Sequence, residues 1–291
     1  ATEFSASPRH IRGDSVSLAL LDSTDERAKV LSVSIKDRGA IPAAAGPGTH
    51  ALWFEPTAGG FTTSTFYAEQ YPAWFVAFQQ QQPLAPRLGL WELSRPSLAG
   101  DLEALGIEDR AADEEDWYGL GRTFPHDIGG SPRASSVFRT TPASTAYLLD
   151  LARAGVAALG LGEDEVVDLL AISVSAVDYA GHIFGNESWE YADALIESDR
   201  LLGQLYRELS RRMDVSVLIT SDHGGPRLPE RVGTGPNLQE DDLVRALEEH
   251  LDAQLGPADY VAAFEDVYIY LTPSALTRRE QVIPLSRAFL T

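Results

Sequence analysis

The feature that most constrains the fold is a pair of continuous apolar runs separated by an amphipathic helical pattern. Val166–Val174 and Val215–Thr220 are rich in aliphatic and β-branched residues, which is typical of strands buried on both faces. Between them, a helical pattern begins after the candidate caps Asn186 and Ser188 and runs to Arg212. A strand, a helix and a strand in this order predict a parallel sheet that is covered by helices.

The N-terminal part adds shorter β-prone runs. Lys29–Ile35 reads as a buried strand, and Ala51–Glu55 and Phe61–Thr65 flank a Pro- and Gly-containing turn at 56–60, which predicts a hairpin. Thr141, as a capping hydroxyl, and Pro142 predict the start of a helix that extends to Gly160. Similar patterns predict a further helix over Leu238–Leu255 and a strand over Asp266–Leu271.

These elements predict an α/β fold with a doubly wound, mainly parallel sheet and helices on both faces. Residues 76–135 lack a clear period and are expected to form an irregular, inserted, cap-like region. The predicted organisation is therefore a first part of the core at 1–75, this insert, and a second part of the core at 136–291.

Composition excludes several classes of function. The 291 residues carry a formal net charge of -20, so binding of nucleic acid through phosphate neutralisation is not expected. No apolar run approaches the ~20 residues that span a bilayer. The chain has no cysteine, so any metal would have to be bound by His, Asp and Glu side chains.

Two clusters of potential metal ligands follow the two long apolar runs. The first contains Asp178 and His182, and the second contains Asp222 and His223. Sites in open α/β sheets lie beyond the carboxyl ends of strands, and these ligand types suit Zn²⁺ or a similar ion. One such pair alone would indicate a polar loop, whereas two pairs favour a metal site. Four ligands do not complete two zinc sites, so either one ion is bound or further ligands lie elsewhere.

A basic pair follows the first predicted strand. Lys36 offers a point charge and Arg38 a planar fork, and together they suit an anionic ester or a phosphate. In isolation, Lys36-Asp37-Arg38 is typical of a solvated turn.

The motifs in combination resemble the alkaline phosphatase superfamily. LAISVSAVDYAGHIFGNESWEYADALIESD (170–199) and LITSDHG (218–224) carry the resemblance, together with VLSVSIKDRGAI (30–41), ALWFEPTAGGFTTSTFY (51–67) and FPH (124–126). More narrowly, the chain resembles the type I phosphodiesterase/nucleotide pyrophosphatase group and its single-domain bacterial alkaline phosphatases.

The resemblance implies two Zn²⁺ ions above the sheet. Asp178 and His182 match two ligands of one ion, and Asp222 and His223 match two ligands of the other. Lys36 and Arg38 match the pair that contacts phosphate oxygens in phosphomonoesterase members. The implied mechanism is in-line attack by a Thr or Ser alkoxide, through a phospho-enzyme.

Parts of the family pattern are not found. No match to the nucleophile or to a further Asp ligand precedes Lys36, and His250 does not lie in the Gly-rich motif of the last His ligand. The chain begins at Ala1 without Met and stops at Thr291. We therefore expect a fragment that lacks both natural ends, with its nucleophile outside the 291 residues.

The expected function is zinc-dependent hydrolysis of small phosphate monoesters, and the expected location, by resemblance, is periplasmic or secreted. Three alternatives are open: a phosphodiesterase or nucleotide pyrophosphatase, a sulfatase or phosphonate hydrolase on the same fold, and a folded but inactive fragment.

Other polar residues receive structural interpretations. His126 is expected to be structural, and Asp193 and Asp199 are expected to face solvent or cap local structure. The hydroxyl run Thr62–Thr65 is interpreted as part of a strand, although it is the first place to look for a nucleophile if the fragment proves active.

Overall fold

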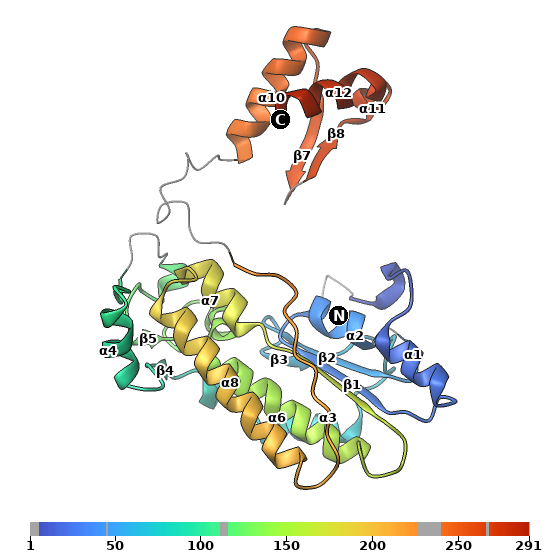
Figure 1. The fold of residues 1–291 in the computed structure, drawn as a ribbon, viewed down its shortest axis with the longest axis vertical. Helices are drawn as coiled ribbons and strands as arrows, with labels where there is room; N and C mark the ends of the chain where they lie inside the picture. The colour runs from blue at the N-terminus through green and yellow to red at the C-terminus, as the bar shows by residue number, and fades with distance from the viewer. Residues whose placement is uncertain (1–5, 45, 111–115, 226–239, 266–267, 291) are drawn as a thin grey trace. The chain divides into compact units, whose positions relative to one another are not determined.

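A computed structural model of the chain describes residues 6–44, 46–110, 116–225, 240–265 and 268–290 (Figure 1). The chain divides into two compact units, residues 1–228 and 229–291, and each has its own hydrophobic core. The boundary at 228 is not among those expected from the sequence. The division of the core by an insert at 76–135 stays a prediction.

The first unit is built on a mostly parallel sheet with the strand order β3-β2-β1-β6 (Figure 1). Its strands are β1 (Val30–Ser34), β2 (His50–Glu55), β3 (Gly60–Thr62) and β6 (Leu169–Ser173). Strand β1 pairs in parallel with both β2 and β6, and only β3 runs antiparallel, as the second arm of the expected hairpin. The predicted α/β fold with a mainly parallel sheet is confirmed.

Helices cover both faces of this sheet because alternate side chains of a strand point to opposite sides. On one face, Ala51 and Trp53 of β2 join the buried residues of α2 (Asp37–Ala44). On the other face, Leu52 and Phe54 belong to a larger cluster with α6 (Pro142–Leu159) and α3 (Ala73–Gln81). The remaining helices of this core are α1 (Val16–Ser23), α5 (Ala134–Val137), α7 (Ala176–Phe184) and α8 (Trp189–Leu209).

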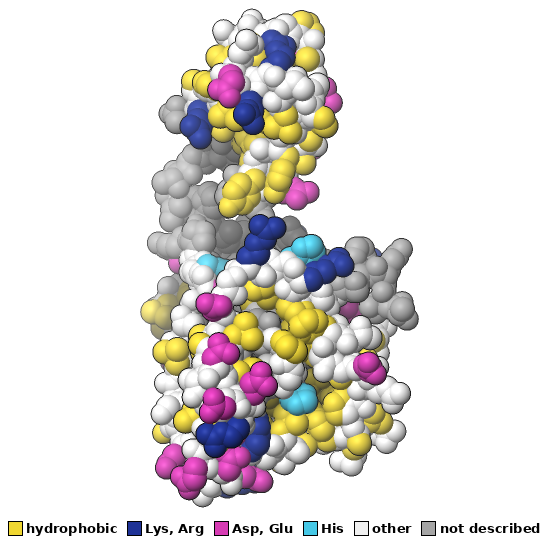
Figure 2. Space-filling view, turned by 90° about the vertical axis from the view of Figure 1, so that its right-hand side faces the viewer, with side chains coloured by type: hydrophobic (Ala, Val, Ile, Leu, Met, Phe, Trp, Pro, Cys, Tyr) yellow, Lys and Arg dark blue, Asp and Glu magenta, His cyan; other side chains and the backbone are white. Residues whose placement is uncertain are grey.

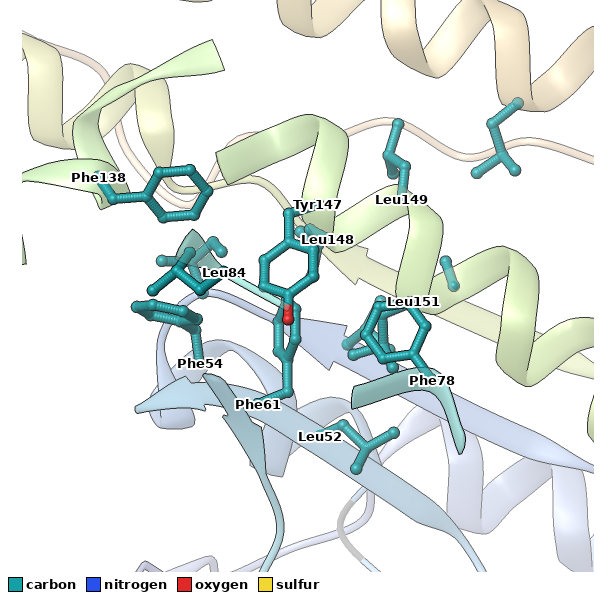
Figure 3. Packing of buried hydrophobic residues seen from close by; sticks show 14 of the residues in the cluster. Leu52, Phe54, Phe61, Phe78, Leu84, Phe138, Tyr147, Leu148, Leu149 and Leu151 are labelled. Carbon is teal, nitrogen blue, oxygen red and sulfur yellow. The ribbon is translucent and has the colours of Figure 1, made fainter. Parts of the chain in front are cut away.

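An aromatic group fills the space between α6 and the sheet (Figure 3). The Tyr147 ring lies 4.8 Å from the Phe61 ring and stacks on Phe78 at 5.7 Å, measured between centroids. The Tyr147 hydroxyl donates a 2.9 Å hydrogen bond to the carbonyl of Gln82, so its buried polar end is satisfied. Helix α6 also lies close to β1, because a Cβ at Gly155 would come within 2.5 Å of the Leu31 side chain.

Helix α6 begins at Pro142, as predicted, but the Thr141 hydroxyl does not cap it. Thr141 has the extended backbone of an N-cap residue, yet its Oγ1 donates to the carbonyl of Phe138. The predicted cap of α8 is confirmed, because the Ser188 hydroxyl accepts a hydrogen bond from the Tyr191 amide.

The apolar run Val215–Thr220 is not a strand, and this prediction was wrong. Residues 214–220 have no regular secondary structure, and Leu218 and Ile219 are 92% and 82% exposed. A strand requires a hydrogen-bonding neighbour, and within the described residues β6 pairs on one side only. For the same reason, β6 is half-buried along its length instead of buried on both faces.

The predicted insert contains short regular elements. Strands β4 (Leu90–Trp91) and β5 (His126–Asp127) form an antiparallel pair, and α4 (Ser97–Ala104) packs on α8. The short 3-10 helices of the first unit are η1 (Pro8–His10), η2 (Ala85–Arg87), η3 (Trp117–Gly119) and η4 (Phe138–Thr140). Residues 111–115 of the insert lie outside the described residues.

Buried carboxylates on α8 hold the insert. The Asp193 carboxylate accepts hydrogen bonds from Trp91 Nε1 and from the Ser94 amide, both at 2.8 Å. Asp193 is fully buried, so the expectation that it faces solvent or caps local structure was wrong, because its carboxylate accepts from donors of the distant insert. Asp199, one turn and a half further along α8, is exposed as expected.

A second buried carboxylate, Glu190, binds His126, which confirms a structural place for this histidine. His126 Nδ1 lies 3.0 Å from the Leu120 carbonyl, and because a carbonyl only accepts, Nδ1 is the donor. His126 Nε2 and Glu190 Oε1 lie 2.8 Å apart. A hydrogen bond between them requires one proton, carried by either the imidazole or the carboxyl group. Burial alone would lower the pKa of His126, but its bonds to Glu190 and Leu120 outweigh burial and raise it. Burial raises the pKa of Glu190.

The second unit is a hairpin packed against helices. Its elements are α10 (Glu240–Leu255), β7 (Val261–Glu265), β8 (Tyr268–Leu271), α11 (Pro273–Leu276) and α12 (Arg279–Leu290). Strands β7 and β8 pair antiparallel, and the Glu248 carboxylate accepts from the backbone amides of Tyr260 and Val261. The predicted helix and late strand of this region are confirmed, although 238–239 and 266–267 lie outside the described residues.

Across the part of the chain that the structure describes, no helix combines the length and the apolar character that crossing a bilayer requires.

We predict that the stability of the protein falls as pH rises above about 6.5, because the unfolded chain then loses the proton that the folded His126–Glu190 pair retains. The free energy of unfolding should decrease by about 1.4 kcal/mol per pH unit until the folded pair itself loses the proton. Urea unfolding at several pH values above 6.5 measures this slope.

Two variants separate this pair from other titrating groups. Glu190→Gln, whose amide can donate to Nε2 without titrating, should reduce the slope. Glu208 lies on α8, as Glu190 does, and forms an exposed ion pair with Arg153 of α6, so Glu208→Gln should leave the slope unchanged. An equal slope in Glu190→Gln and the parent would contradict the shared proton.

Candidate active site

The candidate site lies where the parallel strands β1 and β6 end side by side. Ser34 and Ser173 are paired at these carboxyl ends, the position where ligands bind in open α/β sheets. A Cβ at Gly39 would approach both serine hydroxyls to 2.5 Å. A glycine at this position therefore lets the first turn of α2, which contains Arg38 and directly follows Lys36, pack against the strand ends.

Asp178 and His182 lie on α7, the helix that follows β6. Their spacing of four residues puts them on one helix face, and His182 Nε2 lies 3.4 Å from Asp178 Oδ1. Asp178 is in the first turn of α7, where the helix dipole favours a negative charge. The sequence predicts a cluster beyond a strand, and the structure places it on a helix.

Lys36 connects the end of β1 to this helix. Its ammonium forms an ion pair with Asp178 Oδ2 and lies 4.4 Å from the centroid of the Tyr179 ring. The Lys36 and Asp178 side chains are only 14% and 21% exposed. Burial would raise the pKa of Asp178, but the bond to Lys36 and the nearby His182 and His223 outweigh burial, so this pKa is lowered.

The second predicted cluster reaches the same carboxylate. His223 Nε2 lies 3.5 Å from Asp178 Oδ1 and 3.6 Å from Asp222 Oδ2. His223 Nδ1 faces the Gly224 carbonyl at 3.1 Å and is therefore a donor. When this imidazole is neutral, Nε2 presents a lone pair toward the carboxylates.

The structure thus brings Lys36, Asp178, His182 and His223 together, with Asp222 beside His223. Asp222 is mostly exposed, as are His182 and His223. In Figure 2, histidine side chains lie beside Lys and Arg side chains at the upper end of the first unit. The site is therefore open to solvent on its histidine side.

These side chains fit a metal ion by their chemistry and pairwise spacing. Lone pairs that face each other at 3.4–3.6 Å match the separation of about 3.4 Å between two ligands of a tetrahedral zinc ion. Within the described ranges, however, no three His, Asp or Glu side chains converge as one metal-binding group. Asp178 Oδ2 is paired with the Lys36 ammonium, so a metal ion that binds this oxygen has to replace Lys36 there.

Arg38 lies at the edge of the site. It is exposed on the first turn of α2, and its backbone amide donates to the Asp37 carboxylate. Its positive charge is close enough to lower the pKa of Tyr179, although burial dominates and raises that pKa overall.

Arg139 and Tyr179 contact each other beside the candidate site, and neither was predicted from the sequence. Arg139, in η4, donates from Nη1 to the Tyr179 hydroxyl at 2.7 Å. Tyr179 stands next to Asp178 in the DYAGH motif, and this adjacency was the available signal. Arg139 is far away in the sequence and follows no predicted strand, so no sequence pattern indicated it.

The hydroxyl run after the β2–β3 hairpin has local partners. Thr63 Oγ1 donates to the Ala51 carbonyl at 2.6 Å, and Thr62 Oγ1 shares a 2.7 Å hydrogen bond with the Tyr71 hydroxyl. The buried Ser64 hydroxyl has no hydrogen-bond partner in the described structure. Thr62 and Thr63 thus serve the hairpin, and neither contact marks a nucleophile.

This fold, with acidic, imidazole and lysine side chains at the carboxyl ends of its strands, is that of a known class. Residues 34–279 match the sequence profile of the type I phosphodiesterase / nucleotide pyrophosphatase family. Because this match covers most of the chain, the protein belongs to that family.

Curated relatives include bacterial alkaline phosphatases. The chain is 28% identical to alkaline phosphatase PafA of Elizabethkingia meningoseptica over 286 residues, which cover 93% of this chain and 51% of PafA. It is 30% identical to alkaline phosphatase PhoV of Synechococcus elongatus over 229 residues, which cover 77% of this chain and 41% of PhoV. The chain thus spans about half or less of the length of these relatives.

The solved structures agree with the sequence relatives. The crystal structure of wild-type alkaline phosphatase PafA superposes with a TM-score of 0.78 at 25% identity, covering 94% of this chain and 54% of that one. The expected relation to the alkaline phosphatase superfamily is confirmed.

We predict that Asp178→Asn destabilises the metal-free protein by about 1.5–3 kcal/mol, because a neutral amide replaces the carboxylate that compensates the charge of the poorly exposed Lys36 ammonium. Urea unfolding in the presence of a chelator measures this difference. Asp199→Asn, which changes an exposed carboxylate on α8, is the control and should change stability little. Equal stability of Asp178→Asn and the parent would contradict the ion pair.

Proposed function

We propose that this protein hydrolyses small phosphate esters with the help of bound zinc, and that it prefers monoesters. The single observation that carries the proposal is the convergence of Lys36, His182 and His223 on the Asp178 carboxylate at the carboxyl ends of β1 and β6. Family membership supports the reaction class.

Two zinc ions are proposed, with Asp178 and His182 on one and Asp222 and His223 on the other. The facing lone pairs described above support these assignments. Each pair supplies two of the three or four protein ligands that zinc takes, so further ligands have to come from other residues. Zinc bound there would act as a Lewis acid toward the phosphoryl oxygens.

Lys36 would contact the phosphate of the substrate. Its ammonium is held by Asp178 and by the Tyr179 ring, so a metal ion that takes over Asp178 would leave Lys36 available to an anion. Arg38, in the first turn of the helix that directly follows Lys36, would add a second cation from the exposed side. A monoester dianion gains more from two cations than a diester monoanion does, which is why we propose monoesters.

A phosphodiesterase is the second candidate. Arg38 is exposed and its side chain has no hydrogen bond or ion pair in the described structure. If Arg38 does not reach the phosphate, Lys36 is the cation that remains beside it. A single cation suits a diester, because a diester carries one negative charge. The nucleophile has no assigned residue in either candidate.

The proposed partners are small-molecule phosphate esters, and the proposed location is periplasmic or secreted, by similarity to the alkaline phosphatases.

We predict that the folded protein binds two zinc ions and that a chelator lowers its melting temperature, because zinc stabilises only the state that presents the ligands. Elemental analysis and thermal unfolding measure the two effects. His182→Gln should lower the zinc content, and His10→Gln, an exposed histidine in η1, should not. A content of none or one per chain would favour the folded but inactive alternative.

We predict that Lys36→Ala lowers kcat/KM for an aryl phosphate monoester about 100-fold, because one cation that stabilises the transferring phosphoryl group is lost. For an aryl phosphodiester the loss should be less than about tenfold. Steady-state kinetics with both substrates measure the two losses.

The matched control is Lys29→Ala, at the opposite end of β1, where the ammonium pairs with Asp164. This variant should retain both activities. Equal losses on monoester and diester in Lys36→Ala would contradict the proposed monoester preference.

A further inference from the structure

Two cations lie close to one aromatic ring beside the candidate site. The Lys36 ammonium lies 4.4 Å from the centroid of the Tyr179 ring, and the Arg139 guanidinium lies 4.7 Å from the same centroid. Both distances are within the range of cation–π interactions. Tyr179 is half-buried on α7, directly after Asp178.

Arg139 is held in place by neutral partners. Its Nη1 donates to the Tyr179 hydroxyl at 2.7 Å, and its Nε donates to the Ser136 carbonyl at 3.1 Å. Arg139 is half-buried, and within the described residues no carboxylate pairs with it. Its one side-chain partner in that part of the chain is Tyr179, so an effect of Arg139 on the site passes through Tyr179.

Two contacts of different kinds hold the Lys36 ammonium in place. One is the Asp178 carboxylate and the other is the Tyr179 ring. The proposed function assigns Asp178 to a metal ion, and a metal-bound carboxylate has less negative charge to offer an ammonium. The Tyr179 ring does not bind zinc and keeps its place over Lys36.

From this arrangement we propose that Tyr179 is a positioning residue for Lys36, and that Arg139 acts behind it by fixing the ring through the tyrosine hydroxyl. The inference rests on the proposed role of Lys36 as the phosphate contact. Tyr179 touches neither substrate nor metal in this account. It keeps the Lys36 ammonium at the strand ends when Asp178 is engaged elsewhere.

A double-mutant cycle on the zinc-loaded protein tests this proposal. Tyr179→Leu should lower kcat/KM for an aryl phosphate monoester about tenfold, with little change for the diester, because the cation–π contact is lost. In the Lys36→Ala background, Tyr179→Leu should cause no further loss, because residues that act through one another are not additive. Independent, multiplying losses would overturn the proposal.

Milder variants isolate the bond to Arg139. Tyr179→Phe keeps the ring and removes the hydroxyl, and Arg139→Met removes the donor of the same bond. Both should lose the same small factor in monoester kcat/KM, about threefold, and the double variant should lose no more. Unequal or multiplying losses would overturn the role given to Arg139. These variants keep the test open if Tyr179→Leu does not fold.

Binding of inorganic phosphate gives a readout that does not depend on turnover. By calorimetry, Tyr179→Leu should weaken phosphate binding while its zinc content equals that of the parent. Tyr206→Leu, an exposed tyrosine on α8, is the control and should change neither quantity. Loss of zinc from Tyr179→Leu would overturn the proposal, because it would make Tyr179 a support of the metal ligands.

The outcomes separate this inference from the proposed function. A monoester-specific loss in Lys36→Ala with none in Tyr179→Leu overturns the inference and leaves the proposed function in place. No loss in Lys36→Ala overturns both, because each depends on Lys36 as the phosphate contact.

Discussion

The ion pair between Lys36 and Asp178 is the contact on which the rest of the site depends. It joins the segment after β1 to the helix after β6, and these two strands are neighbours in the sheet. His182 and His223 reach the same carboxylate from a helix and from an irregular segment. The Asp178 carboxylate is poorly exposed, and one ammonium and two imidazoles lie beside it. A carboxylate in such a position requires a neighbouring cation to compensate its charge.

Helix α8 relates this site to the inserted region. It packs beside α7, which carries Asp178, and it presents the buried carboxylates of Glu190 and Asp193 to the insert. Glu190 lies in the first turn of α8, where the helix dipole favours negative charge. The insert is thus fixed by these polar contacts together with apolar packing, in which α4 lies against Trp189 and Trp91 lies against Phe184.

Sequence patterns predicted the parts of the structure that depend on local chemistry. Strands β1 and β2 follow from apolar runs, and the start of α8 from the Ser188 cap. Val215–Thr220 has the same kind of apolar pattern but forms no strand, because strand formation needs a neighbour that the sequence does not specify. The structure brings together the predicted residues Asp178, His182, His223 and Lys36, whereas the burial of Asp193 and the contact of Arg139 with Tyr179 arise from tertiary packing alone.

We propose that His182 and His223 bind metal ions through their imidazoles. The chain has six histidines, so a long-range ¹H–¹⁵N NMR spectrum of the imidazole nitrogens, recorded with and without zinc and assigned with His→Gln variants, tests it directly. Zinc is expected to shift the Nε2 signals of His182 and His223 and to leave those of the buried His126 in place. Unchanged signals for His182 and His223 in the presence of excess zinc would contradict the proposal.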